Sequence, residues 1–238
     1  MLKLAGIAKS FGAKIVLKGI DAEFNPGTIT AIVGANGSGK STFLRILWGE
    51  LERGSGSILW TSEAVDTTSE HWKRLIGAVP DDDALIDGLS IRGHFRLCGG
   101  LSGLAPATVE ERTSKLIDLF GLAEAERTTR SAGEASRGNR KRLACALALI
   151  GEPRVVLMDE PFSGLDVEMS ALLSRIIRMI AGRGLIVAFS SHDDGITRSV
   201  ADRYLFLADG GSTGGFVSNL PGRPTGAAIP EEALPWLG

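Results

Sequence analysis

Apolar and polar positions along the chain follow two patterns, which predict short strands and amphipathic helices. Runs of aliphatic and β-branched residues bounded by Gly, Pro or Asn are typical of strands. Apolar residues at helical spacing, as in Leu116, Ile117 and Phe120, are typical of helices. The strand-like runs cover residues 2–8, 15–24, 29–33, 57–60, 75–79, 155–158, 185–189 and 204–207. Helices are expected over residues 42–47, over much of 90–143 and over 167–180.

The order of these elements predicts an α/β fold with a mainly parallel sheet. Strands that alternate with helices need crossover connections, and the connecting helices cover both faces of the sheet. The stretch between the fifth and sixth strands is helical in pattern and predicts an insertion. We expect one domain over residues 1–210, with a helical subdomain at about 84–142, and an irregular Gly- and Pro-rich tail over 211–238.

A glycine-rich loop follows the third strand and satisfies the pattern G-x-x-x-x-G-K-[ST]. Its glycines let backbone N–H groups crowd round a phosphate, and the positive end of the next helix points there. Lys40 can reach the β- and γ-phosphates of a nucleotide, and the Ser41 hydroxyl can bind Mg²⁺. The strand before the loop and the helix after it argue against a chance glycine-rich turn. The residues expected to bind the nucleotide here are Gly34, Asn36, Gly37, Ser38, Gly39, Lys40, Ser41 and Thr42.

Two carboxylates follow the strand-like run 155–158. P-loop enzymes hold Mg²⁺ with a carboxylate at such a strand end, and Asp159 fits that task. Glu160 would then stand beside the γ-phosphate, where it could polarise an attacking water. Two acids after a strand can also be a solvated strand end or a helix cap, but the glycine-rich loop earlier in the chain favours catalysis.

Composition and charge narrow the classes of protein to which these loops can belong. The 238 residues carry a formal net charge of -2, which provides no basic stripe for nucleic acid. The most continuous apolar stretch, 143–150, is well short of the roughly 20 residues that span a bilayer, and the N-terminus lacks the apolar core of a signal peptide. Cys98 and Cys145 have no metal-like spacing and predict two reduced, half-buried thiols. Any membrane role would need a partner.

The ordered set of motifs resembles the ATP-binding subunits of ABC transporters over roughly residues 2–210. The resemblance implies a P-loop NTPase core with a mainly parallel sheet, an N-terminal antiparallel β portion and an inserted α-helical subdomain. Beyond the two motifs above, it rests on Ser163-Gly164-Leu165-Asp166, on Ser190-Ser191-His192-Asp193, on Ala135-Ser136-Arg137-Gly138-Asn139 ahead of the basic run 140–142, and on Phe11 with Val16.

For the nucleotide, the resemblance implies ATP bound together with Mg²⁺. Phe11 would stack on the adenine with Val16 against the base, although Phe11 could instead belong to the core. The implied catalytic residues are Lys40, Glu160 and His192. The implied metal ligands are Ser41, Asp81 and Asp159. At position 192 the alternative is an ordinary, partly buried histidine without contact to the γ-phosphate.

For partners, the resemblance implies a second ATP-binding subunit, in a homodimer or a heterodimer, and a transmembrane permease subunit. Ser136 and Gly138 would close over the γ-phosphate held by the second subunit, which the loop 163–166 would also touch. The same two residues could simply cap the helix behind them. The basic run 140–142 is expected to be a solvated helix face. The chain would lie at the cytoplasmic face of the cell membrane through the permease, with no nucleic acid as partner.

Two departures from the family pattern bear on catalysis. The glutamine that follows the fifth strand in the family is replaced by Asp81, with Asp82 and Asp83 after it. Its shorter, charged side chain could still bind the metal while its loop contacts the permease. The alternative is that the three aspartates form a solvated acidic turn. The signature segment carries Ala135 and Arg137 where the family usually has leucine and glycine.

The direction of transport and the rate of hydrolysis rest on weaker features. The sequence 99–104 resembles the Gly-Leu turn of exporters, and we expect no added regulatory domain of the kind found in many sugar importers. Export is therefore the leading expectation, and import is the alternative. A soluble ABC-type ATPase acting on DNA or ribosomes would be expected to carry two such domains or a coiled coil. A weakly hydrolysing or regulatory subunit is a further alternative, suggested by Asp81 and the altered signature.

Overall fold

The computed structural model describes residues 1–192, 194–208 and 211–212, and its strands form two sheets. The first is antiparallel, with the order β2-β1-β4-β5, and the second has the order β10-β9-β3-β8-β7-β6. The neighbours from β9 to β6 are parallel, and β10 joins β9 in antiparallel fashion. The strands are β1 (Leu2–Phe11), β2 (Lys14–Phe24), β3 (Ile29–Val33), β4 (Ser55–Trp60), β5 (Glu63–Ala64), β6 (Ile76–Val79), β7 (Val155–Met158), β8 (Ile186–Ser190), β9 (Arg203–Ala208) and β10 (Gly211–Ser212).

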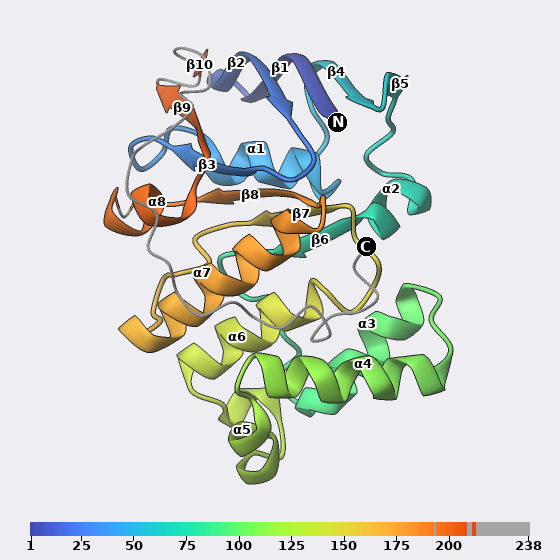
Figure 1. Cartoon of the computed structure of the whole chain (residues 1–238). Coiled ribbons are helices and arrows are strands. Elements are labelled where there is room, and N and C mark those ends of the chain that lie inside the picture. The colour runs from blue at the N-terminus through green and yellow to red at the C-terminus, as the bar shows by residue number, and fades with distance from the viewer. Residues whose placement is uncertain (193, 209–210, 213–238) are drawn as a thin grey trace.

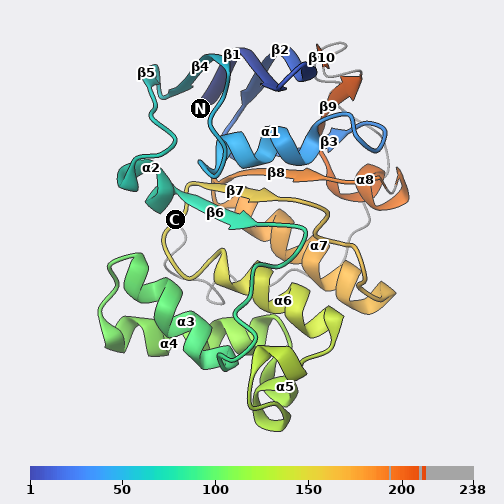
Figure 2. The same ribbon diagram turned by 180° about the vertical axis from the view of Figure 1, so that it is seen from behind.

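Helices cover both faces of the second sheet (Figures 1 and 2). Helix α1 lies between the two sheets, α6 and α7 lie on the opposite face, and α3, α4 and α5 lie further out. The helices are α1 (Lys40–Leu47), α2 (Glu70–Leu75), α3 (Ile91–Leu101), α4 (Pro106–Leu119), α5 (Ala123–Thr128), α6 (Arg137–Leu147), α7 (Val167–Gly182) and α8 (Asp194–Val200), with a 3₁₀ turn at Ala132–Glu134. The molecule is therefore layered, with α1 enclosed and α6 and α7 on the far side of the parallel strands.

The strands of the second sheet are buried on both faces because apolar residues occupy both sides of the pleat. In β7, Val155 and Leu157 pack into the core around α1, whereas Val156 and Met158 pack into the core beneath α6 and α7. Successive side chains of a strand point to opposite faces, so an uninterrupted apolar run is the pattern that such a strand requires. The predicted α/β fold, with a mainly parallel sheet and an N-terminal antiparallel portion, is confirmed.

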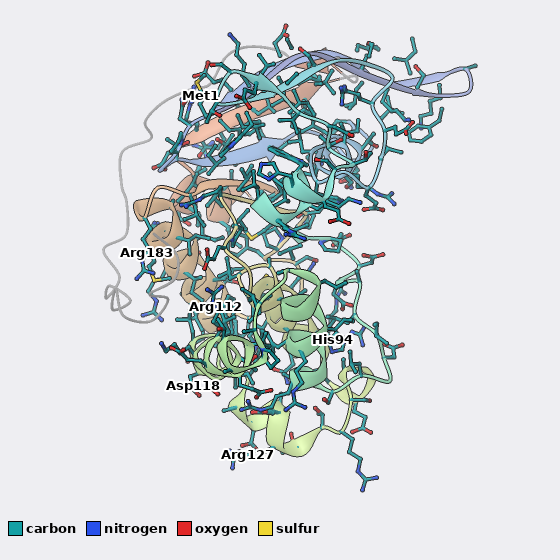
Figure 3. The ribbon with its side chains drawn as sticks, turned by 90° about the vertical axis from the view of Figure 1, so that its right-hand side faces the viewer. Met1, His94, Arg112, Asp118, Arg127 and Arg183 are labelled. Atoms are coloured by element: carbon teal, nitrogen blue, oxygen red, sulfur yellow. The ribbon has the colours of Figure 1, made fainter. Side chains whose placement is uncertain are left out.

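Four helices, α3 to α6, fill the stretch between β6 and β7, and Figure 3 shows this part of the molecule from the side. Arg112 of α4 is buried and donates to the carbonyl oxygen of Ile150 (3.0 Å), just after α6. His94 of α3 is also buried: its Nε2 accepts from the Ile86 N–H (3.0 Å), and its Nδ1 donates to the Ser90 carbonyl (2.8 Å). These contacts fix the helical stretch to the segments by which the chain enters and leaves it.

The differences from the sequence prediction lie in short elements. Leu75 ends α2 and does not begin a strand. Helices α2 and α8 and the two-residue strands β5 and β10 were not predicted, because segments of two to seven residues show too little periodicity. The irregular tail expected over 211–238 lies outside the described residues, apart from the two residues of β10. Among the described helices, none combines the length and the hydropathy needed to cross a membrane.

Both cysteines are free thiols, as predicted. Cys98 is half-buried, whereas Cys145 is buried, and this burial raises the pKa of the Cys145 thiol to about 12. A thiol with so high a pKa stays protonated at neutral pH and is a poor nucleophile. We therefore assign it to the core beneath α6.

Candidate functional site

The predicted nucleotide residues meet at one edge of the parallel sheet, because three neighbouring strands end there. In the β7–β8 register Met158 lies opposite Phe189, and in the β3–β8 register Ile32 lies opposite Ser190. The residues that follow these strands are the glycine-rich loop after β3, the acids after β7 and the histidine segment after β8. The carboxyl edge of a parallel sheet is where α/β proteins bind ligands.

The glycine-rich loop is shaped to surround an anion. Gly37 and Gly39 have φ values of 81° and 100°, which a residue with a Cβ rarely adopts. Gly39 is the N-cap of α1 and offers no side-chain cap, so the N–H groups of the first turn have no intrahelical acceptor. The Ser38 hydroxyl is buried and has no hydrogen-bond partner among the described residues. Unpaired donors and a buried, unpaired hydroxyl at one point fit a phosphate group.

The Lys40 side chain folds back over this loop, so its ammonium group lies where a bound phosphate would be. The residue is 8% exposed, and its Nζ donates to the carbonyl oxygens of Gly34 (2.8 Å) and Ala35 (3.2 Å). A Cβ at Gly34 would lie 2.3 Å from the Leu207 carbonyl oxygen, so the backbone of the loop passes β9 at a distance that only glycine allows. The lysine is thus held at the loop by two neutral acceptors, which a charged phosphate oxygen would outcompete.

The two acids after β7 differ in their surroundings. Asp159 is 4% exposed, and its Oδ1 accepts from the Ser190 Oγ at 2.5 Å. Glu160 has a left-handed backbone, with φ at 47°, and its N–H donates to the same Ser190 Oγ at 2.8 Å. Its Oε2 lies 2.9 Å from His192 Nδ1. A carboxylate can only accept this bond, so the proton is on Nδ1 and Nε2 is left for another partner. The structure therefore brings together Asp159, Glu160 and His192.

At this edge of the sheet, Mg²⁺ would need ligands from the nucleotide in addition to those of the protein. In the described part of the chain, no group of three or more His, Cys, Asp or Glu residues is placed to hold a metal. Mg²⁺ in nucleotide enzymes takes one or two carboxylates or hydroxyls from the protein and completes its octahedron with phosphate oxygens and water. Buried Asp159 and the Ser41 hydroxyl at the start of α1 satisfy that lower requirement.

Asp81, the third predicted metal ligand, lies beside Lys141 of α6, the helix that begins in the signature segment. Lys141 of α6 is buried, and its Nζ donates to the Asp81 carbonyl oxygen (3.0 Å) and lies 3.7 Å from the Asp81 Oδ1. The Asp81 side chain is 60% exposed. Its role at the metal stays a prediction.

The basic run on α6 is not a solvated face, and that expectation is wrong. Arg140 donates to both carboxylate oxygens of Asp83 (2.9 Å each) and to Asp87 (2.7 Å), and these hydrogen bonds raise the pKa of its guanidinium. Arg142 donates to the carbonyl oxygens of Phe120 and Gly121, at 3.1 and 2.8 Å. Each cation has its own partner, because α6 packs against the segment after β6 and the end of α4.

The signature segment begins α6 and lies far from the glycine-rich loop of the same chain. The Ser136 Oγ caps the helix by accepting from the Asn139 N–H (3.3 Å), as the alternative interpretation predicted. Helix α6 lies on the face of the parallel sheet opposite to α1 (Figures 1 and 2). Ser136 and Gly138 are therefore separated by the sheet from the loop 34–41 of their own chain, and their contact with a γ-phosphate stays a prediction.

Of the two predicted adenine residues, Val16 lines an open cleft beside the loop, and Phe11 pairs across the strands with Lys14, which also lines it. A cleft of about 540 Å³ lies between β2 and the loop and is lined by Lys14, Ile15, Val16, Lys18, Ala35, Asn36, Gly37, Ser38, Leu207 and Ala208. Phe11 is 50% exposed, so the alternative that it belongs to the core is wrong. Lys9 Nζ lies 5.3 Å from the centre of its ring. An exposed aromatic ring near such a cleft is available for stacking on a base.

One residue of the site was missed by sequence reasoning, namely Ser190. It was noted only as part of the segment that contains the histidine, and its bonds to the two acids could not be predicted. The available signal is weak: a hydroxyl residue ends an otherwise apolar buried strand.

Comparisons with known proteins agree with this geometry. Residues 17–163 match the family model described as ABC transporter. The chain is 32% identical to the Nod factor export ATP-binding protein I of Rhizobium sp. (strain N33), covering 88% of this chain and 68% of that protein. It is also 32% identical to the lipoprotein-releasing system ATP-binding protein LolD of Bacteroides thetaiotaomicron, covering 88% of this chain and 98% of that protein.

An import protein matches to a similar degree. The Fe(3+) ions import ATP-binding protein FbpC of Pseudomonas fluorescens is 35% identical, over 88% of this chain and 59% of that protein. Among solved structures, an ATP-binding subunit of an ABC transporter superposes with a TM-score of 0.83 at 24% identity, covering 92% of this chain and 90% of that one. A dimeric ATP-binding cassette in a post-hydrolysis state with ADP and Pi gives 0.80, also at 24% identity, covering 89% and 96%.

Proposed function

We propose a function from one premise: this chain belongs to the ABC transporter family, as an ATP-binding subunit with ATPase activity. On that premise, it hydrolyses ATP to power the movement of a substrate across a membrane through a separate transmembrane permease subunit. The observation that carries this is the meeting of the glycine-rich loop, Asp159, Glu160 and His192 at one sheet edge. The sequence favours export, but relatives named for export and for import match at 32% and 35% identity, so the direction stays a prediction.

Within this proposal, the residues of the loop bind the phosphates of ATP. Lys40 exchanges its two carbonyl acceptors for phosphate oxygens, while the N–H groups of the first turn of α1 and the Ser38 hydroxyl donate to the same oxygens. Mg²⁺, held by Ser41 and Asp159, would neutralise phosphate charge. The adenine enters the cleft beside Val16, next to the exposed ring of Phe11.

Glu160 and His192 act on the attacking water and the terminal phosphate. The Glu160 carboxylate is 18% exposed and is held by His192 Nδ1, so one carboxylate oxygen has a fixed orientation. The other oxygen is left to accept a proton from water, as a general base must. His192 is 67% exposed, and its Nε2 is the ring atom available to the γ-phosphate.

The complete site needs a second ATP-binding subunit, in a homodimer or a heterodimer. Ser136 and Gly138 stand at the N-terminus of α6, on the far side of the sheet from their own loop, so they would donate to a γ-phosphate held by the partner. We place the ATP-binding domain at residues 1–210 with a helical subdomain at 84–142. The segment that contains Asp81 would contact the permease at the cytoplasmic face of the membrane.

The experiment that tests this function is Glu160→Gln, which keeps the shape of the side chain and removes the base. We expect steady-state phosphate release to fall at least 100-fold, equivalent to about 2.7 kcal/mol in the barrier, because general base catalysis is lost. ATP binding by calorimetry should be preserved, and light scattering should detect a nucleotide-bound dimer.

The matched control is Glu63→Gln, at an exposed glutamate of the two-residue strand β5, which should leave turnover unchanged. A Glu160→Gln variant whose turnover stays within threefold of wild type, about 0.6 kcal/mol, would remove Glu160 from catalysis.

A further inference from the structure

Ser190 occupies a position between the two acids of the site. It is the last residue of β8 and is 0% exposed. Its Oγ donates to Asp159 Oδ1 at 2.5 Å and accepts from the Glu160 N–H at 2.8 Å. A hydroxyl is one of the few small groups that can donate and accept at once, so one atom holds two consecutive residues of the neighbouring strand end.

Glu160 needs such a contact because of its backbone. Its φ of 47° lies in the left-handed region, which is unfavourable for a residue with a Cβ and persists only where the surroundings fix it. The structure supplies a bond on each side: the N–H of Glu160 donates to Ser190, and its carbonyl accepts from the Ser163 N–H at 3.1 Å. Without the Ser190 hydroxyl, the Glu160 N–H loses the acceptor that it has among the described residues.

Asp159 is oriented by the same atom. One carboxylate oxygen is taken by the Ser190 hydroxyl, so the other is left for a cation. Rotation of the carboxylate would break a short bond in a buried environment, where hydrogen bonds are costly to lose. The orientation of Asp159 and the backbone of Glu160 therefore depend on one hydroxyl.

We propose that Ser190 is a positioning residue for ATP hydrolysis, which fixes the Asp159 carboxylate and the Glu160 backbone as one unit. The proposal rests on the roles proposed above for Asp159 and Glu160. It adds that the hydroxyl at position 190, and not merely a well-packed side chain, sets the rate. Ser190 does not touch the nucleotide in this scheme and acts through its two neighbours.

The test compares Ser190→Thr with Ser190→Val in the full chain, because the two side chains have nearly the same volume and differ in the hydroxyl. We expect the valine variant to lose at least tenfold in kcat relative to the threonine variant, with KM for ATP within twofold. Hydrogen exchange at the Glu160 amide, followed by NMR, should be at least tenfold faster with valine. A residue that only packs the strand would not change kcat without KM, nor expose this amide.

A matched control is Thr30→Val on the adjacent strand β3. Its hydroxyl is also fully buried but has no hydrogen-bond partner among the described residues, so its loss should leave kcat within twofold. Equal kcat values for Ser190→Thr and Ser190→Val would overturn the proposal, and so would an unchanged Glu160 amide.

If the added methyl group unfolds both variants, the test uses Ser190→Ala, which adds no volume. Compared with the wild type, this variant must show a kcat at least tenfold lower and a Glu160 amide that exchanges at least tenfold faster. Smaller effects reject the proposal. Glu160→Gln, assayed alongside, separates the two claims. If that variant is inactive while Ser190→Val is not, only the role of Ser190 is lost. If Glu160→Gln retains turnover, the role proposed for Glu160 in ATP hydrolysis fails.

Discussion

Two regions of the molecule are stabilised by different interactions. The first is the nucleotide edge, where the glycine-rich loop, Asp159, Glu160 and His192 meet, and the second is the joint, where α6 packs against the segment after β6. At the nucleotide edge, the shape comes from glycine backbones, unpaired helix N–H groups and one buried hydroxyl. At the joint, it comes from charge: Arg140 binds Asp83 and Asp87, and Lys141 binds the backbone of Asp81. The first region suits a ligand that supplies the missing charge, whereas the second is already neutralised within the chain.

The difference also appears in how far water and salt reach each region. Arg140 is 21% exposed and Asp83 is 15% exposed, so water reaches the pair and salt can screen it. At the nucleotide edge, the bond between Ser190 and Asp159 is more deeply buried, since these residues are 0% and 4% exposed. The joint therefore connects the segment after β6 to α6, and so to Ser136 at the start of that helix, through ion pairs and backbone hydrogen bonds.

The largest effect is expected at the nucleotide edge from Lys40→Ala. The variant loses the one lysine of the loop, and a charge-assisted bond to phosphate is worth about 1.5–3 kcal/mol, so the dissociation constant of MgATP should rise about 30-fold, equivalent to about 2 kcal/mol. Calorimetry measures this, with Lys3→Ala on the exposed side of β1 as the control. Unchanged affinity would show that the loop does not bind phosphate through Lys40.

A moderate effect is expected at the joint from Arg140→Ala. Loss of a partly exposed, bidentate ion pair should lower the free energy of unfolding by about 1–2 kcal/mol, between the values for surface and buried pairs. Thermal unfolding should then shift by about 2–8 °C. The double variant with Asp83→Ala measures the coupling of the two residues.

An exposed ion pair serves as the control for the effect of Arg140→Ala on stability. Arg127 pairs with Glu124 on α5, and both side chains are more than 70% exposed. Arg127→Ala should therefore cost less than about 0.5 kcal/mol. If both arginine variants lose the same stability, the joint is no more than another surface pair.

A small effect on activity in the isolated chain is expected from Asp81. The Asp81 side chain is 60% exposed, so Asp81→Ala should change the ATPase rate of the chain alone by less than about threefold, which is about 0.6 kcal/mol. In the complex with the permease the loss should be larger, and Asp81→Gln should restore much of it. Phosphate release with and without the permease measures both. Small and equal effects in the two settings would leave Asp81 as part of a solvated acidic turn.

The nucleotide edge could be predicted from the sequence because its parts are local. The loop before Lys40, the acids Asp159 and Glu160, and His192 each follow a buried strand directly, and parallel strands bring such positions to one edge. The fold followed from the same regularity, since strands buried on both faces appear as uninterrupted apolar runs.

The joint could not be predicted, because its partners are far apart in the sequence. Arg140 and Asp83 are separated by 57 residues, and nothing local distinguishes a paired arginine from a solvated one. The role of Ser190 could not be predicted for a related reason: the sequence does not show whether the hydroxyl of a serine at a strand end is hydrogen-bonded. In both cases the decisive information is which element packs against which.

The position of β3 in the sheet has a consequence for how the protein folds during its synthesis. This strand precedes the glycine-rich loop and ends at Val33, yet the strands on both its sides are β8 and β9, made from residues 186–190 and 203–208. Chains leave the ribosome from the N-terminus, so β1 and β2 can form their hairpin early. Strand β3 cannot pair until its two neighbours have been synthesised, more than 150 residues later. The ability to hold a phosphate therefore arrives only after β8 and β9 have been synthesised, and a chain that stops before β8 lacks the strands that position this loop.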